Sequence, residues 1–191
     1  MTLYHGDAHE IVDQRFLHQA KYVLVTDPPY PNNAGHFVEG IDAAYEFLTG
    51  IDCEAIVFWS ELERPPVPLP LVAVHVWHRA NVNGRPSEFA YHFCPSGVKR
   101  RSEIYRHAAI FDGAGPGSFE YLGHPTQKPV ALMQQLIRKV SPAIVLDPFA
   151  GVGSTLRAAK NLGFKAEGVE ISSRYCRIAS ERLAQEVLAV A

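Results

Sequence analysis

Short apolar runs alternate with segments of helical periodicity along most of the chain. Tyr22–Thr26 and Ala55–Trp59 are almost uninterrupted apolar runs, which is typical of strands buried on both faces of a parallel sheet. In Thr126–Val140 the apolar residues recur at helical spacing instead. Strands that alternate with helices predict an α/β domain, in which helices cover both faces of the sheet.

The same patterns predict the remaining elements. Further strands are expected at Val72–Trp77, Glu88–Phe93, Ala143–Leu146 and Lys165–Val169, and further helices over Asp42–Leu48, Ser154–Leu162 and Ser172–Val187. A loop with Asn83 and Gly84 joins the strands 72–77 and 88–93. Because Asn-Gly favours tight hairpin turns, we expect an antiparallel hairpin at one edge of the sheet. Neither an internal repeat nor a long linker interrupts the pattern, so residues 1–191 are expected to form a single domain.

Composition is that of an ordinary globular domain. The 191 residues are 47% apolar and 20% charged, which allows one domain with a full core. No apolar run approaches the ~18 residues of a membrane helix, and the start lacks the features of a secretory signal. We therefore expect a cytoplasmic protein without membrane contact. Cys53, Cys94 and Cys176 lie far apart, and His75 and His78 would point to opposite faces of a strand, so no metal site is expected.

A glycine-rich turn, LDPFAGVGST at Leu146–Thr155, separates a predicted strand from a predicted helix. Gly151 and Gly153 would let the backbone approach a ligand, and the following helix start can face an anionic group. Glu170 ends the next strand, about twenty residues later, where an acid can bind both hydroxyls of a ribose. The turn thus predicts a nucleotide-like ligand. The alternative is a glycine turn that only connects a strand to a helix. Asp147 would face a positive part of the ligand or cap the helix.

A second loop, Thr26–Pro31 (TDPPYP), directly follows a buried strand. Its prolines end the strand and stiffen the loop, which clusters the Asp27 carboxylate, the carbonyls of Pro28 and Pro29, and the Tyr30 ring. This cluster suits the amino group of a flipped-out base. Asp27 and the Pro28 carbonyl would accept its two N–H groups, and Tyr30 would stack on its ring. By itself the string is also an ordinary turn sequence.

Five stretches of the chain resemble the β group of DNA amino-methyltransferases. DPPY is similar to the catalytic motif of that family, and DPFAGVGST resembles its cofactor loop. HPTQKPVALMQQLI, at His124–Ile137, resembles the segment that precedes the loop. GVEISSRYCRIASERL resembles the ribose-binding strand and its helix, and LYHGDAHEIV the opening strand. The catalytic motif precedes the cofactor loop, as in the β group and unlike families that methylate protein glutamine.

The resemblance implies a fold and a cofactor. The fold is a doubly wound, mostly parallel seven-stranded sheet, the Rossmann-like methyltransferase fold in circularly permuted form, with the hairpin at its edge. The strand order would be Thr2–Tyr4, Lys165–Val169, Ala143–Leu146, Tyr22–Thr26, Ala55–Trp59, Glu88–Phe93, Val72–Trp77. The cofactor would be S-adenosylmethionine, held by Asp7, Lys128, Asp147, Phe149, Gly151, Gly153, Ser154 and Glu170. Lys128 could instead be an exposed residue at the start of a surface helix.

The activity implied is methylation of DNA at N6 of adenine, with Asp27, Pro28, Pro29 and Tyr30 as the catalytic residues. DPPY is the usual form in the adenine enzymes, which include members of restriction–modification systems, whereas SPPY is typical of cytosine enzymes. The alternatives are an N4-cytosine DNA methyltransferase, an RNA base methyltransferase, and a non-catalytic nucleic-acid-binding scaffold subunit.

Charge bears on how DNA would be recognised. The formal net charge is −2, whereas autonomous DNA-binding proteins usually carry a basic excess. The basic residues Lys99, Arg100, Arg101 and Arg106 cluster in the segment 95–123. This segment is either a short inserted target-recognition element or a solvated surface loop. Single-stranded DNA, a partner protein or a homodimer could therefore be needed for recognition.

Overall fold

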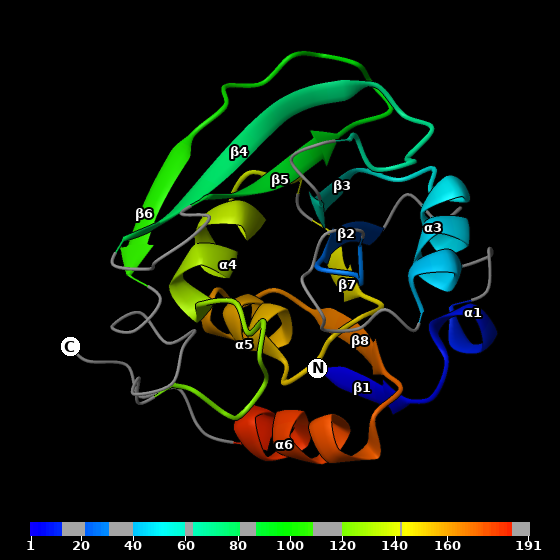
Figure 1. The fold of residues 1–191 in the computed structure, drawn as a ribbon, viewed down its shortest axis with the longest axis vertical. Helices are drawn as coiled ribbons and strands as arrows, with labels where there is room; N and C mark the ends of the chain where they lie inside the picture. The colour runs from blue at the N-terminus through cyan, green and yellow to red at the C-terminus, as the bar shows by residue number, and fades with distance from the viewer. Residues whose placement is uncertain are drawn as a thin grey trace.

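A computed structural model of the protein describes residues 1–12, 22–30, 40–59, 63–80, 87–108, 120–141 and 143–184. The predicted turn at Asn83 and Gly84 lies outside the described residues, as do residues 185–187 of the helix predicted over Ser172–Val187. Figure 1 shows a twisted sheet with helices on both sides.

The described part of the chain forms one sheet of eight strands. The strands are β1 (Thr2–His5), β2 (Tyr22–Thr26), β3 (Ala55–Trp59), β4 (Leu71–Ala80), β5 (Ser87–Phe93), β6 (Ile104–Ala108), β7 (Ile144–Asp147) and β8 (Ala166–Glu170). Their spatial order is β1-β8-β7-β2-β3-β5-β4-β6. The strands β1, β8, β7, β2 and β3 run parallel, and β5 is antiparallel to both β3 and β4. The predicted order of seven strands is confirmed.

The eighth strand corrects the prediction at the edge of the sheet. Ile104–Ala108, inside the segment 95–123, pairs in parallel with β4 and becomes the outermost strand. The hairpin of β4 and β5 therefore lies inside the sheet and not at its edge. The run IYRHA has no regular alternation of apolar and polar residues and so predicts a strand weakly, and its pairing with β4 stabilises it.

Helices cover both faces of the sheet. On one face lie α4 (Val130–Ile137), α5 (Ser154–Asn161) and α6 (Ser173–Ala184), and on the other lie α1 (Ala8–Ile11) and α3 (Ile41–Thr49) (Figure 1). Every residue of β2 and β3 is buried. Alternate residues of these strands enter two separate apolar clusters, one beneath α4 and α5 and one beneath α3. Burial on both faces explains why the two strands are continuous apolar runs.

The strand directions decide where loops from distant parts of the chain meet. The parallel strands β1, β8, β7 and β2 all end at one edge of the sheet, and so their following loops lie there. In open α/β sheets, ligands bind outside this carboxyl edge. The TDPPYP loop and the glycine-rich turn follow the adjacent strands β2 and β7.

Candidate active site

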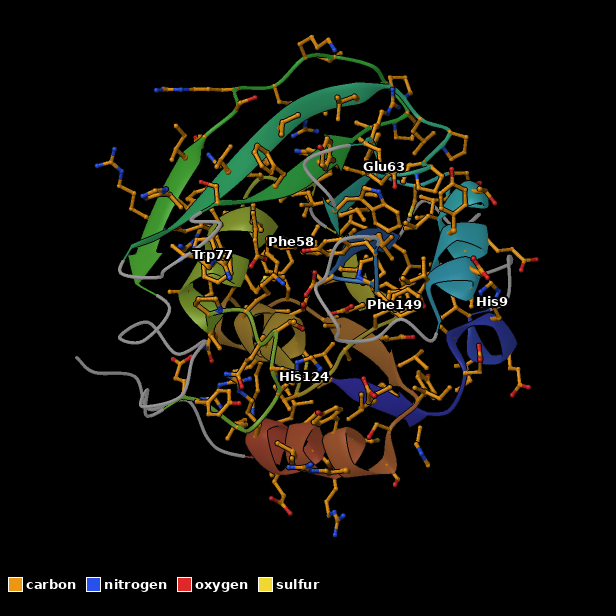
Figure 2. The ribbon with its side chains drawn as sticks, viewed as in Figure 1. His9, Phe58, Glu63, Trp77, His124 and Phe149 are labelled. Atoms are coloured by element: carbon orange, nitrogen blue, oxygen red, sulfur yellow. The ribbon has the colours of Figure 1, made fainter. Side chains whose placement is uncertain are left out.

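A cavity of about 690 Å³ opens at the carboxyl edge of the sheet. This volume lies within the roughly 300–1,000 Å³ of small-molecule sites. Ten of the twelve predicted site residues line the cavity: Asp7, Asp27, Pro28, Pro29, Lys128, Asp147, Phe149, Gly151, Ser154 and Glu170. Three lining residues are labelled in Figure 2, where His9 and Phe149 lie toward α3 and His124 lies toward α6. The fold thus brings the two loops together around one space.

Asp27, the first residue after β2, has one oxygen bound and one oxygen free. The ammonium of Lys128 donates to Oδ2, whereas Oδ1 is buried and has no partner among the described residues. Burial raises the pKa of Asp27 to about 6; Lys128 opposes this rise and Glu88 adds to it. A buried acceptor without a partner is costly unless a ligand completes it. Oδ1 is therefore suited to accept an N–H from a molecule in the cavity.

Lys128 is only 5% exposed, so it is not a surface residue at the start of a helix. Its ammonium contacts the Asp27 carboxylate, lies 3.1 Å from Glu88 Oε2, and sits 4.8 Å from the centre of the Phe58 ring. Burial disfavours its charge, but Asp27 and Glu88 outweigh this and raise the pKa of Lys128 above its usual range. Lys128 lines the cavity, yet its charge is committed to these two carboxylates.

Asp147 ends β7 and is 3% exposed. Its Oδ1 accepts from the hydroxyl of Thr26 at 2.7 Å and from the amide of Phe149 at 3.2 Å. Burial raises the pKa of Asp147 to about 6, although hydrogen bonds from Thr155 and Thr26 lower it. The N-cap of α5 is Gly153, so Asp147 is not the helix-capping acid. It joins the ends of β2 and β7 and places a carboxylate in the cavity wall.

Glu170, at the end of β8, is held by two backbone amides. Gly151 donates to Oε2 at 2.7 Å and Ser172 donates to Oε1 at 2.8 Å. Burial raises the pKa of Glu170, an effect that these two hydrogen bonds oppose. The carboxylate thereby links the glycine-rich turn to the loop after β8 and has a fixed orientation at the cavity wall.

Asp7 and Phe149 lie where β1 and β7 lead into the cavity. Asp7 is the N-cap of α1, and its Oδ1 accepts from the amide of His9 at 2.7 Å. The Phe149 ring meets Phe47 of α3 edge to face, with ring centres 5.7 Å apart. The pair provides an apolar wall to which a flat ligand ring can pack.

Two predicted residues, Tyr30 and Gly153, do not line the cavity. Tyr30 is 9% exposed and packs against Trp59, with ring centres 5.7 Å apart. Gly153 begins α5, and an added Cβ would lie 3.1 Å from the Cβ of Ala179 on α6. Gly153 thus permits two helices to approach closely, and its predicted cofactor contact stays a prediction.

His124 and Tyr175 are cavity residues that the predictions omitted. Their ring centres are 4.6 Å apart, so they form an aromatic pair between the segment before α4 and α6. Burial and the nearby Lys128 charge lower the pKa of His124 to about 4, which keeps the imidazole neutral at pH 7. Both residues lie within stretches that carry the resemblance, His124 at the start of HPTQKP and Tyr175 inside GVEISSRYCRIASERL, so these motifs themselves were a signal.

The basic residues at 99–101 lie near the amino ends of the parallel strands, at the end of the sheet opposite the cavity. Arg100 pairs with Glu54, which precedes β3, at 2.9 Å, and donates to the carbonyl of Lys139 at 2.9 Å. Lys99 donates to the carbonyl of Leu71, the first residue of β4. These two cations therefore hold the fold together and do not face the cavity. Within the segment 95–123, the strand β6 runs toward the carboxyl edge as far as Ala108, and 109–119 lie outside the described residues.

Two further findings concern the described residues alone. Among them, no group of three or more His, Cys, Asp or Glu side chains is arranged to hold a metal ion. Their helices are also too short or too polar for any one of them to cross a membrane.

Comparison with solved structures identifies the fold. The crystal structure of an M1.HpyAVI–SAM complex matches with a TM-score of 0.68 and 24% identity, covering 96% of this chain and 99% of that one. The PvuII DNA methyltransferase, described as cytosine-N4-specific, matches with a TM-score of 0.68 and 13% identity over 98% of this chain and 87% of that one. The fold is therefore the Rossmann-like methyltransferase fold.

Sequence comparison gives the family. The model of the N6/N4 methyltransferases, described as "DNA methylase", matches residues 73–181, more than half of the chain. The chain belongs to this family of DNA methylases. The Type II methyltransferase M.ScaI of Streptomyces caespitosus is 34% identical over 46% of the chain and 30% of its own length. The DNA adenine methyltransferase YhdJ of Escherichia coli is 47% identical over 34% of the chain and 22% of its own length. This chain thus matches less than a third of either relative.

Proposed function

We propose that this protein transfers the methyl group of S-adenosylmethionine to the exocyclic N6 of adenine in DNA. One observation carries the proposal: Asp27 of the DPPY loop and the turn at Gly151 with Glu170 line the same cavity. A methyl donor bound at the turn and an acceptor amine bound at Asp27 would then be neighbours, and positioning of this kind contributes several kcal/mol to catalysis.

The wall residues fit the parts of S-adenosylmethionine. When bound, the cofactor supplies an electrophilic methyl group on a positively charged sulfur. The Glu170 carboxylate, oriented by two backbone amides, would accept from the ribose hydroxyls. Asp147 places negative charge where the positive groups of the ligand would lie. Asp7 and the Phe149 ring would border its adenine ring.

The acceptor side uses the free oxygen of Asp27. Oδ1 and the Pro28 carbonyl would accept the two N–H groups of the target amine, which frees the nitrogen lone pair from conjugation with the base. Because the pKa of Asp27 is about 6, the carboxylate is charged at pH 7. This pKa is also close enough to pH 7 for the carboxylate to act as a base and take up a proton. Tyr30 is largely buried against Trp59 and does not line the cavity, so we place it as a support behind the loop that would hold the target base.

Adenine is favoured as the target because DPPY resembles the adenine form of the motif, and because the YhdJ relative is described as an adenine methyltransferase. N4-cytosine is the second candidate, because its amino group has the same chemistry and the PvuII enzyme shares the fold. The partner proposals are DNA, in single-stranded form or with help from another protein, and a homodimer that supplies a second recognition surface.

Methyl transfer with deuterium-labelled S-adenosylmethionine tests the proposal. Duplex DNA, single-stranded DNA and RNA oligomers would be incubated with the protein, and the product nucleosides identified by mass spectrometry. The expected product is labelled N6-methyldeoxyadenosine, in strongly reduced amount with the Asp27→Asn variant. N4-methyldeoxycytidine would select the second candidate and a methylated ribonucleoside an RNA enzyme. Cofactor binding without transfer to any oligomer would refute the proposed activity and favour a scaffold role.

A further inference from the structure

Four charged side chains of alternating sign run outward from the cavity. Asp27 of the loop after β2 contacts Lys128 of the segment before α4, Lys128 lies 3.1 Å from Glu88 of β5, and Glu88 lies 3.1 Å from Arg79 of β4. Lys128 is 5% exposed and the Glu88 side chain 18%. Four separate elements thus supply one line of charge that begins at the proposed proton acceptor.

Proton uptake by Asp27 changes the charge balance of this line. A neutral Asp27 no longer compensates the ammonium of Lys128, which is buried against the Phe58 ring. An uncompensated buried charge is strongly unfavourable. Without a second anion, Lys128 would therefore oppose the protonation of Asp27. Glu88 is that second anion, and Arg79 balances its charge on the outer side.

We propose that Glu88 is a positioning residue that keeps Lys128 paired while Asp27 accepts the proton of the methylated amine. The inference rests on the proposed function. In the step, the amine nitrogen forms a bond to the methyl carbon, and the carbon–sulfur bond breaks with its electron pair passing to sulfur. The surplus N–H proton passes to Asp27 Oδ1. Lys128 stays an ammonium and Glu88 a carboxylate throughout, so charge is conserved without any other reactant.

The remaining titratable groups near the line come from other elements. Asp147 at the end of β7 faces Asp27, His124 faces Lys128, and Tyr30 faces Asp27, Lys128, Glu88 and Arg79. Burial raises the pKa of Tyr30 and lowers that of His124 to about 4, so both are neutral at pH 7. Glu88 is therefore a charge coupled to Asp27 that a single substitution can remove without changing a residue that lines the cavity, whereas Lys128 itself lines the cavity.

Carbon-13 NMR titration of aspartate carboxyl groups in the ligand-free protein tests the charge coupling directly. The Asp27 signal is assigned by its loss in Asp27→Asn. We expect its midpoint, near pH 6 in the wild type, to fall in Glu88→Gln and to rise in Lys128→Met by about one unit or more. Glu103→Gln is the matched control, because the ion pair of Glu103 with Lys139 lies at the end of the sheet opposite the cavity. This variant should leave the Asp27 midpoint unchanged.

These measurements can overturn the inference. A midpoint that stays or rises in Glu88→Gln refutes the role of Glu88. If Glu88→Gln does not fold, Lys128→Met provides the test. An unchanged or lowered Asp27 midpoint in Lys128→Met refutes the charge coupling along the line. A purely structural role for the line would not shift the two variants in opposite directions.

The pH profile of kcat/KM for methyl transfer tests the catalytic part. We expect the acid limb to follow the NMR midpoints, with a plateau that falls roughly 3- to 10-fold in Glu88→Gln because Asp27 becomes a weaker base. If the NMR midpoint of Asp27 shifts in Glu88→Gln but the acid limb of the kcat/KM profile does not, proton transfer to Asp27 is refuted. A wild type that transfers no methyl group refutes the proposed function, whereas unchanged midpoints in an active enzyme refute only the role of Glu88.

Discussion

Replacing Gly153 by alanine should destabilise the protein far more than the same change at Gly163. Both glycines have left-handed backbone, with φ of +77° and +76°. An alanine there costs about 1–2 kcal/mol from backbone strain alone. At Gly163 nothing lies within 4 Å of the added Cβ, whereas at Gly153 the Cβ of Ala179 is 3.1 Å away. Overpacking between α5 and α6 adds about 1–3 kcal/mol.

The expected losses are therefore about 2–5 kcal/mol for Gly153→Ala and about 1–2 kcal/mol for Gly163→Ala. In a chain of this size, 1 kcal/mol corresponds to roughly 2–4 °C in Tm. Urea unfolding followed by circular dichroism measures both free energies, and calorimetry with S-adenosylmethionine measures affinity for the folded protein. Equal losses in the two variants would refute the close approach of the helices. A large loss of cofactor affinity in folded Gly153→Ala, with little loss of stability, would support the predicted cofactor contact of Gly153.

Three further predictions concern single side chains. Asp27→Asn should lower kcat for methyl transfer by about 10²-fold or more, while the cofactor Kd in calorimetry changes little; retention of a tenth of the activity would contradict its role. Glu170→Gln should weaken cofactor binding by roughly 10-fold or more through loss of a charge-assisted hydrogen bond, with kcat at saturation largely kept; an unchanged Kd would exclude the ribose contact. Burial and the nearby His92 lower the pKa of His75 to about 4, so its stabilising contribution is complete above about pH 6.5 and is lost as the pH falls toward 4. His75→Phe should flatten this fall in urea-unfolding free energy by on the order of 2 kcal/mol, and an unaltered slope would show that His75 is not responsible.

The two loops of the site were recognisable because their chemistry is local. Two prolines after a buried strand, and two glycines between a strand and a helix, restrict the backbone whatever lies around them. Asp27 and Gly151 could therefore be predicted as site residues from short strings. The continuous apolar runs at Tyr22–Thr26 and Ala55–Trp59 similarly indicated central strands, because a parallel strand is buried on both faces.

Contacts with a neighbour distant in sequence were not predictable. Lys128 was predicted as a cofactor residue, with an exposed helix position as the alternative, and only the fold places it beside Asp27 and Glu88. Gly153 was predicted from a ligand-binding motif, and only the fold shows its close approach to the Cβ of Ala179. The basic run at 99–101 left a recognition element and a solvated loop as alternatives, whereas Arg100 pairs with Glu54, which precedes β3 at the end of the sheet opposite the cavity. Charge patterns alone do not specify which partner a side chain meets.

Short-range physics thus accounts for the strands, the helices and the two functional loops, since each follows from a few consecutive residues and their backbone preferences. Packing of the whole domain decided the rest: the parallel pairing of β6, the burial of Lys128 between two carboxylates, and the pairing of His124 with Tyr175. The reason is physical. Burial and the approach of charges depend on how separate elements pack, and that arrangement is not encoded in any short stretch of the chain.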